Sequence, residues 1–335
     1  TAAPTIVWFR RDLRVQDNPA LAAALERGGP IVPVYVFAPD EEGDWSPGGA
    51  SRWWLHHALE SLADALAERG LALTLRRGPT GEALRGLAAE VGADAVHWNR
   101  RYEPAIIARD TAIKAALRAE GLEARSFNAS LLWEPHEVEN KQGRPFMVLT
   151  PFWRHLQTLP VRPPASILEG PFPSPSTAPA SLALEDLDLL PRLSWADGFT
   201  DHWTPTLAGA SEALAGFLDG PVERYTARRD RPAVRGTSRL SPFLAHGQLG
   251  PRQVWAAAHA SGATEGKDGF KFLSEIGWRE FGYHLLVHFD HTPTEALNAG
   301  YRDFPWQPDE AALVAWQKGQ TGYPVVDAGM RELWH

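Results

Sequence analysis

The stretch that decides the first half of the fold spans residues 5–37 and reads TIVWFRRDLRVQDNPALAAALERGGPIVPVYVF. Its apolar ends, Thr5 to Phe9 and Ile31 to Phe37, have the length and the β-branched and aromatic content of buried strands. Between them a helix is predicted over Pro19 to Arg27, because Asn18 is a favourable N-cap and proline is favoured at the first helical position. A strand, a helix and a second strand in this order predict a parallel βαβ unit.

The same alternation continues to residue 127. Further strands are expected at Leu71 to Leu75, Ala93 to Trp98 and Glu123 to Phe127, and further helices at Arg52 to Arg69 and Ile106 to Glu120, closed by Gly70 and Gly121. We therefore predict an α/β domain at residues 1–130 with a five-stranded parallel, Rossmann-like sheet. No GxGxxG follows the first strand, so a dinucleotide site of the usual kind is not expected there.

The composition is that of a globular protein with about two domains. A chain of 335 residues, 44% of them hydrophobic, can bury substantial cores. The sequence shows no apolar run of membrane-spanning length and no secretory leader, which predicts a cytoplasmic protein without a membrane partner. It has no cysteine, and its 12 histidines lack metal-ligand spacing, so we expect neither disulfides nor a metal site.

The second half of the sequence begins with a proline-rich segment. Nine prolines fall between Thr158 and Pro205, and we predict an interdomain linker at residues 131–205. Helical patterns follow at Leu207 to Leu218, Gln253 to Ala260, Phe270 to His288 and Glu310 to Gln317. An all-α domain is therefore expected at residues 206–335.

The last helical pattern runs from Val325 to Trp334. It carries Val326, Met330 and Leu333 on one face, and the sequence stops at His335 without a capping glycine. An apolar stripe with nothing following it predicts that the helical domain is incomplete at its C-terminus.

Basic residues gather in one segment although the net charge is −8. Arginine occupies positions 224, 228, 229, 231, 235 and 239, against the single acid Asp230. At the end of this segment Thr237, Ser238 and Ser241 place hydroxyls around Arg239, just before a helix that we expect to start at Pro242. Hydroxyls, free backbone N–H groups and a guanidinium suit a pyrophosphate. The alternatives are a serine-rich helix N-cap and a solvated arginine surface.

A second cluster falls on the longest predicted helix. Glu275, Trp278, Arg279 and Gly282 follow the spacing i, i+3, i+4 and i+7 and therefore share one face. An acid, a large aromatic surface, a cation and a gap together could receive a flat anionic ligand such as a flipped-out nucleotide. The alternative is a Glu–Arg pair beside a packing tryptophan.

Motifs along the whole chain resemble the DNA photolyase/cryptochrome family, and most of all bacterial cyclobutane pyrimidine dimer (CPD) photolyases. They are WFRRDLRVQDNPAL at 8–21, GTSRLSP at 236–242, EIGWREF at 275–281 and GQTGYPVVDAGMR at 319–331, in the order the family has them. The resemblance implies a flavoprotein lyase that repairs pyrimidine dimers in DNA. Excited reduced FAD would give an electron to the dimer, the ring would open, and the electron would return.

The resemblance also implies roles for particular residues. FAD is expected on Tyr225, Thr237, Ser238, Arg239, Leu240, Ser241 and Phe272; the dimer on Glu275 and Trp278; and DNA on Arg229, Glu275, Trp278, Arg279 and Gly282. Trp306 matches the outermost tryptophan of the family's electron-transfer chain. The inner tryptophans and further flavin contacts are expected beyond residue 335, so activity and tight FAD binding are expected of the intact protein.

An antenna chromophore is a further expectation from the resemblance. The segment WNRRYEP at 98–104 is followed by Ala105 and Ile106, where the best-known bacterial folate sites have Asn and Glu. It looks closer to folate-binding relatives of another photolyase class, or to deazaflavin binders. We favour methenyltetrahydrofolate, with deazaflavin or a flavin as alternatives.

Other functions remain open at this point. They are a cryptochrome-type blue-light sensor, a (6-4) photolyase, and a nucleotide-binding protein without photochemistry. Trp278 together with Glu275 favours repair over sensing, by resemblance. The expected partner is damaged DNA, and the protein is expected to be a monomer.

Overall fold

A parallel sheet forms the first half of the computed structural model, which describes residues 2–167 and 169–334. Within these residues five strands pair in the order β3-β2-β1-β4-β5. Their bounds are Thr5–Phe9 (β1), Ile31–Phe37 (β2), Thr74–Arg77 (β3), Ala95–Asn99 (β4) and Glu123–Phe127 (β5). Trp8 of central β1 lies opposite Val34 on one side and Trp98 on the other. The predicted α/β class is confirmed, and this order puts the topological switch point between β1 and β4.

Helices cover both faces of the sheet. They are α1 (Pro19–Glu26), α2 (Gly49–Ala67), α3 (Thr80–Val91) and α4 (Pro104–Ala119). Helices α1 and α2 pack on the face of Val7 and Phe9, whereas α3 and α4 pack on the face of Ile6 and Trp8. The predicted cap of α1 is confirmed, because the side-chain oxygen of Asn18 accepts a 3.1 Å hydrogen bond from the Leu21 N–H.

The strand predicted at Leu71 to Leu75 is wrong in its position. β3 begins only at Thr74, which pairs with Val34 of β2. Leu71 instead closes α2: its N–H donates to the Leu66 carbonyl at 3.0 Å, and its side chain is buried against the helix end. Leu71 is therefore part of the C-terminal cap of α2 and not the first residue of the strand.

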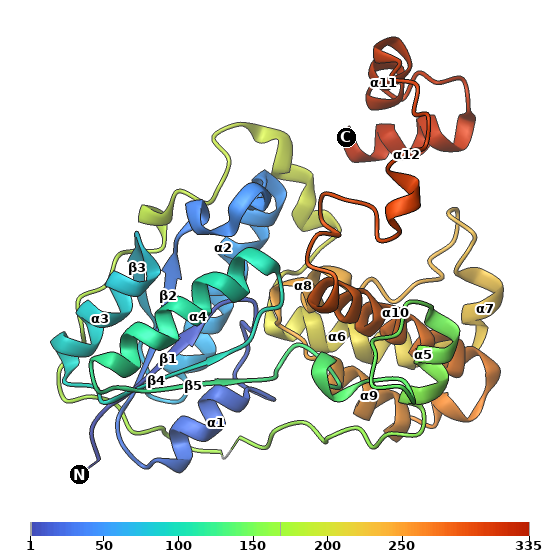
Figure 1. The fold of residues 1–335 in the computed structure, drawn as a ribbon. Helices are drawn as coiled ribbons and strands as arrows, with labels where there is room; N and C mark the ends of the chain where they lie inside the picture. The colour runs from blue at the N-terminus through green and yellow to red at the C-terminus, as the bar shows by residue number, and fades with distance from the viewer. Residues whose placement is uncertain (1, 168, 335) are drawn as a thin grey trace.

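Helices make up the second half of the chain. They are α5 (Leu149–Leu156), α6 (Leu207–Leu218), α7 (Tyr225–Arg228), α8 (Ser241–His246), α9 (Pro251–Ala260), α10 (Lys267–His288), α11 (Glu310–Gln317) and α12 (Pro324–Trp334). Short 3₁₀ helices lie at Pro39–Trp45, Pro135–Glu137, Glu185–Leu187, Ser194–Asp201, Pro221–Arg224, Ala263–Glu265 and Ala299–Tyr301. Helix α10 lies among the others, while α11 and α12 stand apart from them (Figure 1). No helix in the described ranges is both long and apolar enough to cross a membrane.

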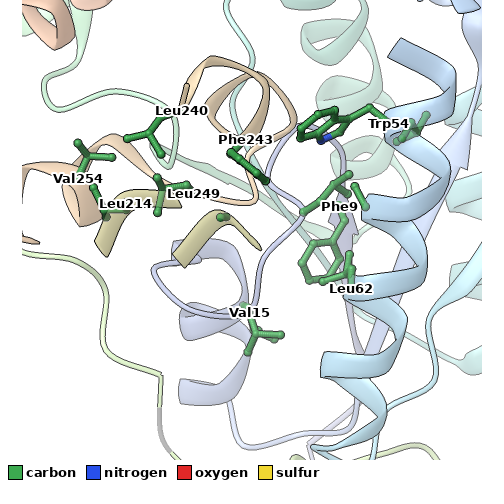
Figure 2. Packing of buried hydrophobic residues seen from close by; sticks show 14 of the residues in the cluster. Phe9, Val15, Trp54, Leu62, Leu214, Leu240, Phe243, Leu249 and Val254 are labelled. Atoms are coloured by element: carbon green, nitrogen blue, oxygen red, sulfur yellow. The ribbon is translucent and has the colours of Figure 1, made fainter. Parts of the chain in front are cut away.

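The two halves share one hydrophobic core (Figure 2). Phe9 and Trp54 from the sheet half belong to the same cluster as Leu240, Phe243 and Val254 from the helical half. The loop that precedes α8 is therefore anchored to the sheet half through Leu240 and Phe243.

The segment predicted as a linker has structure of its own. It contains α5, which packs on α10, and then runs back along the sheet half (Figure 1). There the Phe172 N–H donates to the Arg69 carbonyl at 2.7 Å, and the Leu182 N–H donates to the Leu75 carbonyl at 3.0 Å. Residue 168, which falls in this segment, lies outside the described residues, as do residues 1 and 335 of the two predicted domains. The boundaries at 130 and 205 stay predictions.

A buried polar cluster joins the halves, and it comes from the stretch with which the fold begins. The Arg14 guanidinium donates to the carbonyls of Gly247 and Ala129, both at 2.9 Å. Asp17 receives Arg14 at 3.2 Å and Arg252 of α9 at 3.3 Å. Since buried charges must be paired, these contacts fix the helical half against the carboxyl end of β1.

Candidate functional site

Helix α10 presents one face to the core and another to solvent. Phe272 and Ile276 are buried on its inner face, whereas the Trp278 side chain is 48% exposed on the outer one. Phe281 supports the Trp278 ring edge-on, at 6.2 Å between centroids. The predicted aromatic surface is therefore available to a ligand.

Glu275, one turn before Trp278, is held by cations. Its Oε1 lies 3.0 Å from Nζ of Lys271 and is also hydrogen-bonded by Arg229 of the segment after α7. That hydrogen bond raises the pKa of Arg229 above its usual value. Glu275, which was predicted to hold the dimer, and Arg229, which was predicted to contact DNA, thus contact each other.

Arg279 points away from this face. It donates to the Ser130 carbonyl at 2.5 Å, lies 3.5 Å from Oε1 of Glu280, and stacks 4.9 Å from the centroid of Tyr283. Arg279, which was predicted to contact DNA, thus holds the segment that follows β5 in this structure. Gly282 is exposed, and within the described ranges a Cβ at this position would have no neighbour within 4 Å.

Tyr225 and Phe272 come together, as expected of residues assigned to one cofactor. With Phe217 they form a buried aromatic cluster, in which the Phe217 and Phe272 centroids are 4.8 Å apart and Tyr225 lies 5.7 Å from each. Burial raises the pKa of Tyr225. This cluster connects α7 to the inner face of α10.

The hydroxyl-arginine loop lies directly before α8, which begins at Ser241, one residue earlier than expected. Thr237 and Ser241 are exposed and Ser238 is half-buried, while Leu240 is buried in the shared core. Within residues 2–167 and 169–334 the hydroxyls of this loop make no side-chain hydrogen bond, and Arg239 pairs with no carboxylate. Free hydroxyls and an unneutralised guanidinium fit a diphosphate.

Trp306 is 75% exposed and packs on Phe304, with the centroids 4.7 Å apart. It lies in the connection between α10 and α11, and no aromatic contact within the described residues links it to Tyr225 or Phe272. Its accessibility suits an outermost position in an electron-transfer chain.

Two buried polar residues of α10 were not singled out from the sequence. Oε2 of Glu280 accepts the N–H of Leu132 at 2.9 Å, and burial raises the pKa of this carboxyl to about 7. Nε2 of His284 accepts the N–H of Phe146 at 3.0 Å, and burial lowers its pKa to about 4. Both side chains hold the segment between the halves. A polar residue at an inward position of an apolar stripe was the signal that could have found them.

Cavities lie where the sheet half meets the helical half. One of about 120 Å³, at the carboxyl ends of β1 and β2, is lined by Trp8, Arg10, Tyr35, Phe37, Arg101 and His246. A larger one of about 940 Å³ lies between the end of the 3₁₀ helix Pro39–Trp45, the start of α4 and the end of α10. Within the described part of the chain, no group of acidic and histidine side chains is arranged to hold a metal ion.

The fold and the site together indicate a class of protein. A doubly wound parallel sheet with a cavity at the carboxyl ends of its strands, joined to helices that carry an exposed tryptophan and a loop of free hydroxyls, is typical of α/β proteins that bind a cofactor.

Comparison with known proteins identifies the family. Residues 5–171 match the model for DNA photolyase, and residues 272–335 match that for the FAD binding domain of DNA photolyase. The deoxyribodipyrimidine photo-lyase of Agrobacterium fabrum is 45% identical over 339 residues, which cover 99% of this chain and 69% of that protein. This chain belongs to the DNA photolyase/cryptochrome family, as its motifs predicted, and carries part of an FAD-binding domain.

Other relatives agree. The crystal structure of a bacterial class III photolyase from Agrobacterium tumefaciens superposes with a TM-score of 0.91 at 44% identity, covering all of this chain and 69% of that one. Cryptochrome-1 of Arabidopsis thaliana is 37% identical over 98% of this chain and 50% of its own length. The matched relatives thus include both photo-lyases and cryptochromes, and the photo-lyase of Agrobacterium fabrum is more similar in sequence than the cryptochrome.

Proposed function

We propose that the intact protein repairs cyclobutane pyrimidine dimers in DNA under blue light, as a deoxyribodipyrimidine photo-lyase. The observation that carries this proposal is the solvent-facing side of α10, where the exposed Trp278 stands one turn from Glu275 and Arg229. Relatives named as photo-lyases support it at 45% identity.

On this proposal the outer face of α10 recognises the lesion. Trp278 stacks on the flat face of the dimer, an interaction that contributes about 1–3 kcal/mol per base in other proteins. Glu275 accepts hydrogen bonds from the imide N–H groups of the bases. Because Arg229 then faces the DNA backbone, a phosphate competes with Glu275 for its guanidinium.

The helical half holds the cofactor. Reduced FAD, when bound and excited by blue light, supplies the electron that opens the cyclobutane ring, and the electron returns afterwards. Thr237, Ser238, Arg239 and Ser241 would bind the diphosphate, with Leu240 anchoring their loop in the core. Tyr225 and Phe272 would stiffen the wall between α7 and α10, and exposed Trp306 would pass electrons inward from a reductant in solution.

The antenna chromophore would occupy the larger cavity. Drug-sized molecules need roughly 300–1,000 Å³, which the cavity of about 940 Å³ offers and the cavity of about 120 Å³ does not. Its wall combines apolar side chains such as Trp45 and Leu286 with charged side chains of both signs. Arg11 and Arg101 in this wall pair with Glu42 and Glu103, so the cavity suits a flat ring system with polar edges. We favour methenyltetrahydrofolate over deazaflavin or a second flavin. Mass spectrometry of the chromophore released from native protein tests this assignment.

The proposal is tested by binding and by repair of defined lesions. The intact protein, with its flavin reduced, should bind an oligonucleotide with one thymine dimer more tightly than its undamaged counterpart. It should restore that oligonucleotide under blue light and leave a (6-4) lesion unchanged. Restoration of the (6-4) lesion alone would assign the other repair reaction.

A blue-light sensor of the cryptochrome kind is the second candidate, because cryptochrome-1 of Arabidopsis thaliana is 37% identical to this chain. Full flavin loading without repair of either lesion would favour it. We further propose that the protein is a cytoplasmic monomer without a membrane partner. Cell fractionation tests the location and the absence of a membrane partner, and light scattering tests the monomeric state.

A further inference from the structure

Arg239 adopts an unusual backbone conformation. Its φ is +54°, in the left-handed region that residues with a Cβ rarely occupy. On one side Gly236 packs so closely on α7 that a Cβ there would lie 2.5 Å from the Arg228 carbonyl oxygen. On the other side Leu240 is buried in the core. The loop is thus fixed at both flanks, and Arg239 projects from its tightest point.

An aromatic ring supports the Arg239 side chain. Its guanidinium carbon lies 4.0 Å from the centroid of the Trp203 ring, over its face. Guanidinium groups stack on aromatic rings in this way while their N–H edges stay free for hydrogen bonds. With no carboxylate partner in the described ranges, those edges are available to an anion.

Trp203 is itself held from the sheet half. Its ring meets Trp54 of α2 edge to face, with the centroids 5.4 Å apart. Trp54 is buried, and its indole N–H donates to Oε1 of Gln248 at 2.7 Å. The Gln248 amide in turn donates to the carbonyl of Pro205, two residues after Trp203, at 2.8 Å. This closed set of contacts leaves the Trp203 ring little freedom to turn.

We infer that Trp203 is a positioning residue for the cofactor. It fixes the orientation of Arg239 so that the guanidinium edge meets the FAD diphosphate, and it links that loop to α2 of the sheet half. The inference rests on the proposed FAD-binding role of residues 237–241. On this inference Trp203 acts through Arg239, whose guanidinium it supports.

Comparing the binding of FAD with the binding of riboflavin distinguishes a positioning role of Trp203 from a general structural role. FAD carries the diphosphate and riboflavin lacks it, so Trp203→Ala in the intact apoprotein should weaken FAD binding and leave riboflavin binding unchanged. A cation–π contact contributes about 1–2 kcal/mol when partly buried, which corresponds to a roughly 5- to 30-fold rise in the Kd of FAD. Trp203→Phe keeps a ring under Arg239 and should stay within about threefold of the parent. Titration followed by flavin fluorescence anisotropy measures each value.

A double-mutant cycle tests the route of the effect. If Trp203 acts through Arg239, Trp203→Ala should add nothing to the loss caused by Arg239→Ala. Trp195→Ala is a matched control, since Trp195 is half-exposed in the same segment and packs on Phe199 rather than on Arg239. Additive losses, or equal losses for FAD and riboflavin, would overturn the inference.

The proposed cradle is tested separately. The combined variant Thr237→Ala/Ser238→Ala should weaken FAD binding whatever Trp203 does. If it leaves FAD affinity unchanged, the diphosphate assignment itself fails. If it weakens FAD binding while Trp203→Ala does not, the cradle stands and the positioning role of Trp203 is wrong.

Discussion

At the scale of single residues, Glu280 is a titratable group inside the protein. Its side chain is 3% exposed and its pKa is raised to about 7 by burial. Between the ordinary glutamate pKa and this value, the folded state binds a proton that the unfolded chain has lost. The stability that this proton gives is complete at pH below the ordinary value and is lost as the pH rises through about 7.

Replacing Glu280 separates charge from hydrogen bonding. Glu280→Gln keeps an oxygen that accepts the Leu132 N–H but removes the titration, so the free energy of unfolding should no longer decline as the pH rises from about 4.5 to 7. Glu280→Ala leaves the N–H groups of Leu132 and Trp133 without their acceptor and should cost about 1–3 kcal/mol. Urea unfolding across this pH range measures both.

His284 acts in the opposite direction in the same range. Its pKa is lowered to about 4, so its contribution to stability is present above the ordinary histidine value and is lost as the pH falls through about 4. His284 contributes equally in the parent and in Glu280→Gln, so its contribution cancels in the difference between their free energies of unfolding. An unchanged pH dependence in the Gln variant would contradict the role given to Glu280.

Trp278 should determine lesion affinity in the dark. Trp278→Ala removes the stacking surface and should weaken binding of dimer-containing DNA by roughly one to two powers of ten, from about 1–3 kcal/mol per stacked base. Trp278→Phe should recover most of the loss. Trp316→Ala, at a similarly exposed tryptophan of α11, is the control and should bind as the parent does. Fluorescence anisotropy with reduced and oxidised protein gives the affinities, and parental binding by Trp278→Ala would exclude it from the interface.

Helical spacing predicted part of this site and could not predict the rest. The periodicity of α10 placed Glu275 and Trp278 on one face, because that depends on local geometry alone. The inward turn of Arg279 depends on the Ser130 carbonyl, which lies 149 residues away in sequence. The platform under Arg239 likewise comes from Trp203, outside every motif. Contacts between distant segments are set by tertiary packing, which spacing does not encode.

At the scale of elements, local signals fixed several boundaries. Strands β1, β2 and β5 and helices α6 and α11 have the predicted bounds, since apolar runs of the right length end at turn or capping residues. The helix α5 was not predicted; it lies inside residues 131–205, which were predicted as a linker. Its amphipathic pattern is only eight residues long, and it gains its stability from packing on α10.

The joint between the halves should depend on Asp17. Its buried carboxylate neutralises Arg14 and Arg252 and accepts the Ala165 N–H at 2.8 Å. Asp17→Ala leaves those guanidinium groups without a counter-charge and should lower the free energy of unfolding by about 3–5 kcal/mol.

Asp17→Asn is the matched control for that prediction. It keeps an acceptor for Ala165 and tolerates the φ of +50° found at this position, but it also removes the counter-charge of Arg14 and Arg252. It should therefore recover only the part of the loss that comes from the hydrogen bond and the backbone. Denaturant unfolding measures both variants. Equal stability of the parent and Asp17→Ala would show that the halves are held by their shared apolar core instead.

At the scale of the whole molecule, charge is distributed unevenly. The net charge is −8, yet arginines dominate residues 224–239, and Arg231 and Arg235 are exposed. Replacing either arginine with Gln should weaken the binding of damaged and undamaged DNA alike. It should also lower, by about one, the magnitude of the slope of the logarithm of the DNA association constant against the logarithm of the salt concentration. Arg279→Gln should change that slope less, because Arg279 is held inward. Anisotropy titrations at several salt concentrations give the slopes. Equal slopes in the parent and the Arg235 variant would show that DNA does not contact Arg235.

On the proposed function, α10 presents a lesion to an electron-donating flavin. The most direct measurement is the light-dependent restoration of an oligonucleotide with a single thymine dimer by the intact protein with reduced flavin. We expect full restoration under blue light, none in the dark, and a severe loss in the Glu275→Ala/Trp278→Ala variant at unchanged flavin content. Absence of restoration by fully reduced, flavin-loaded protein, or undiminished restoration by that variant, would contradict it.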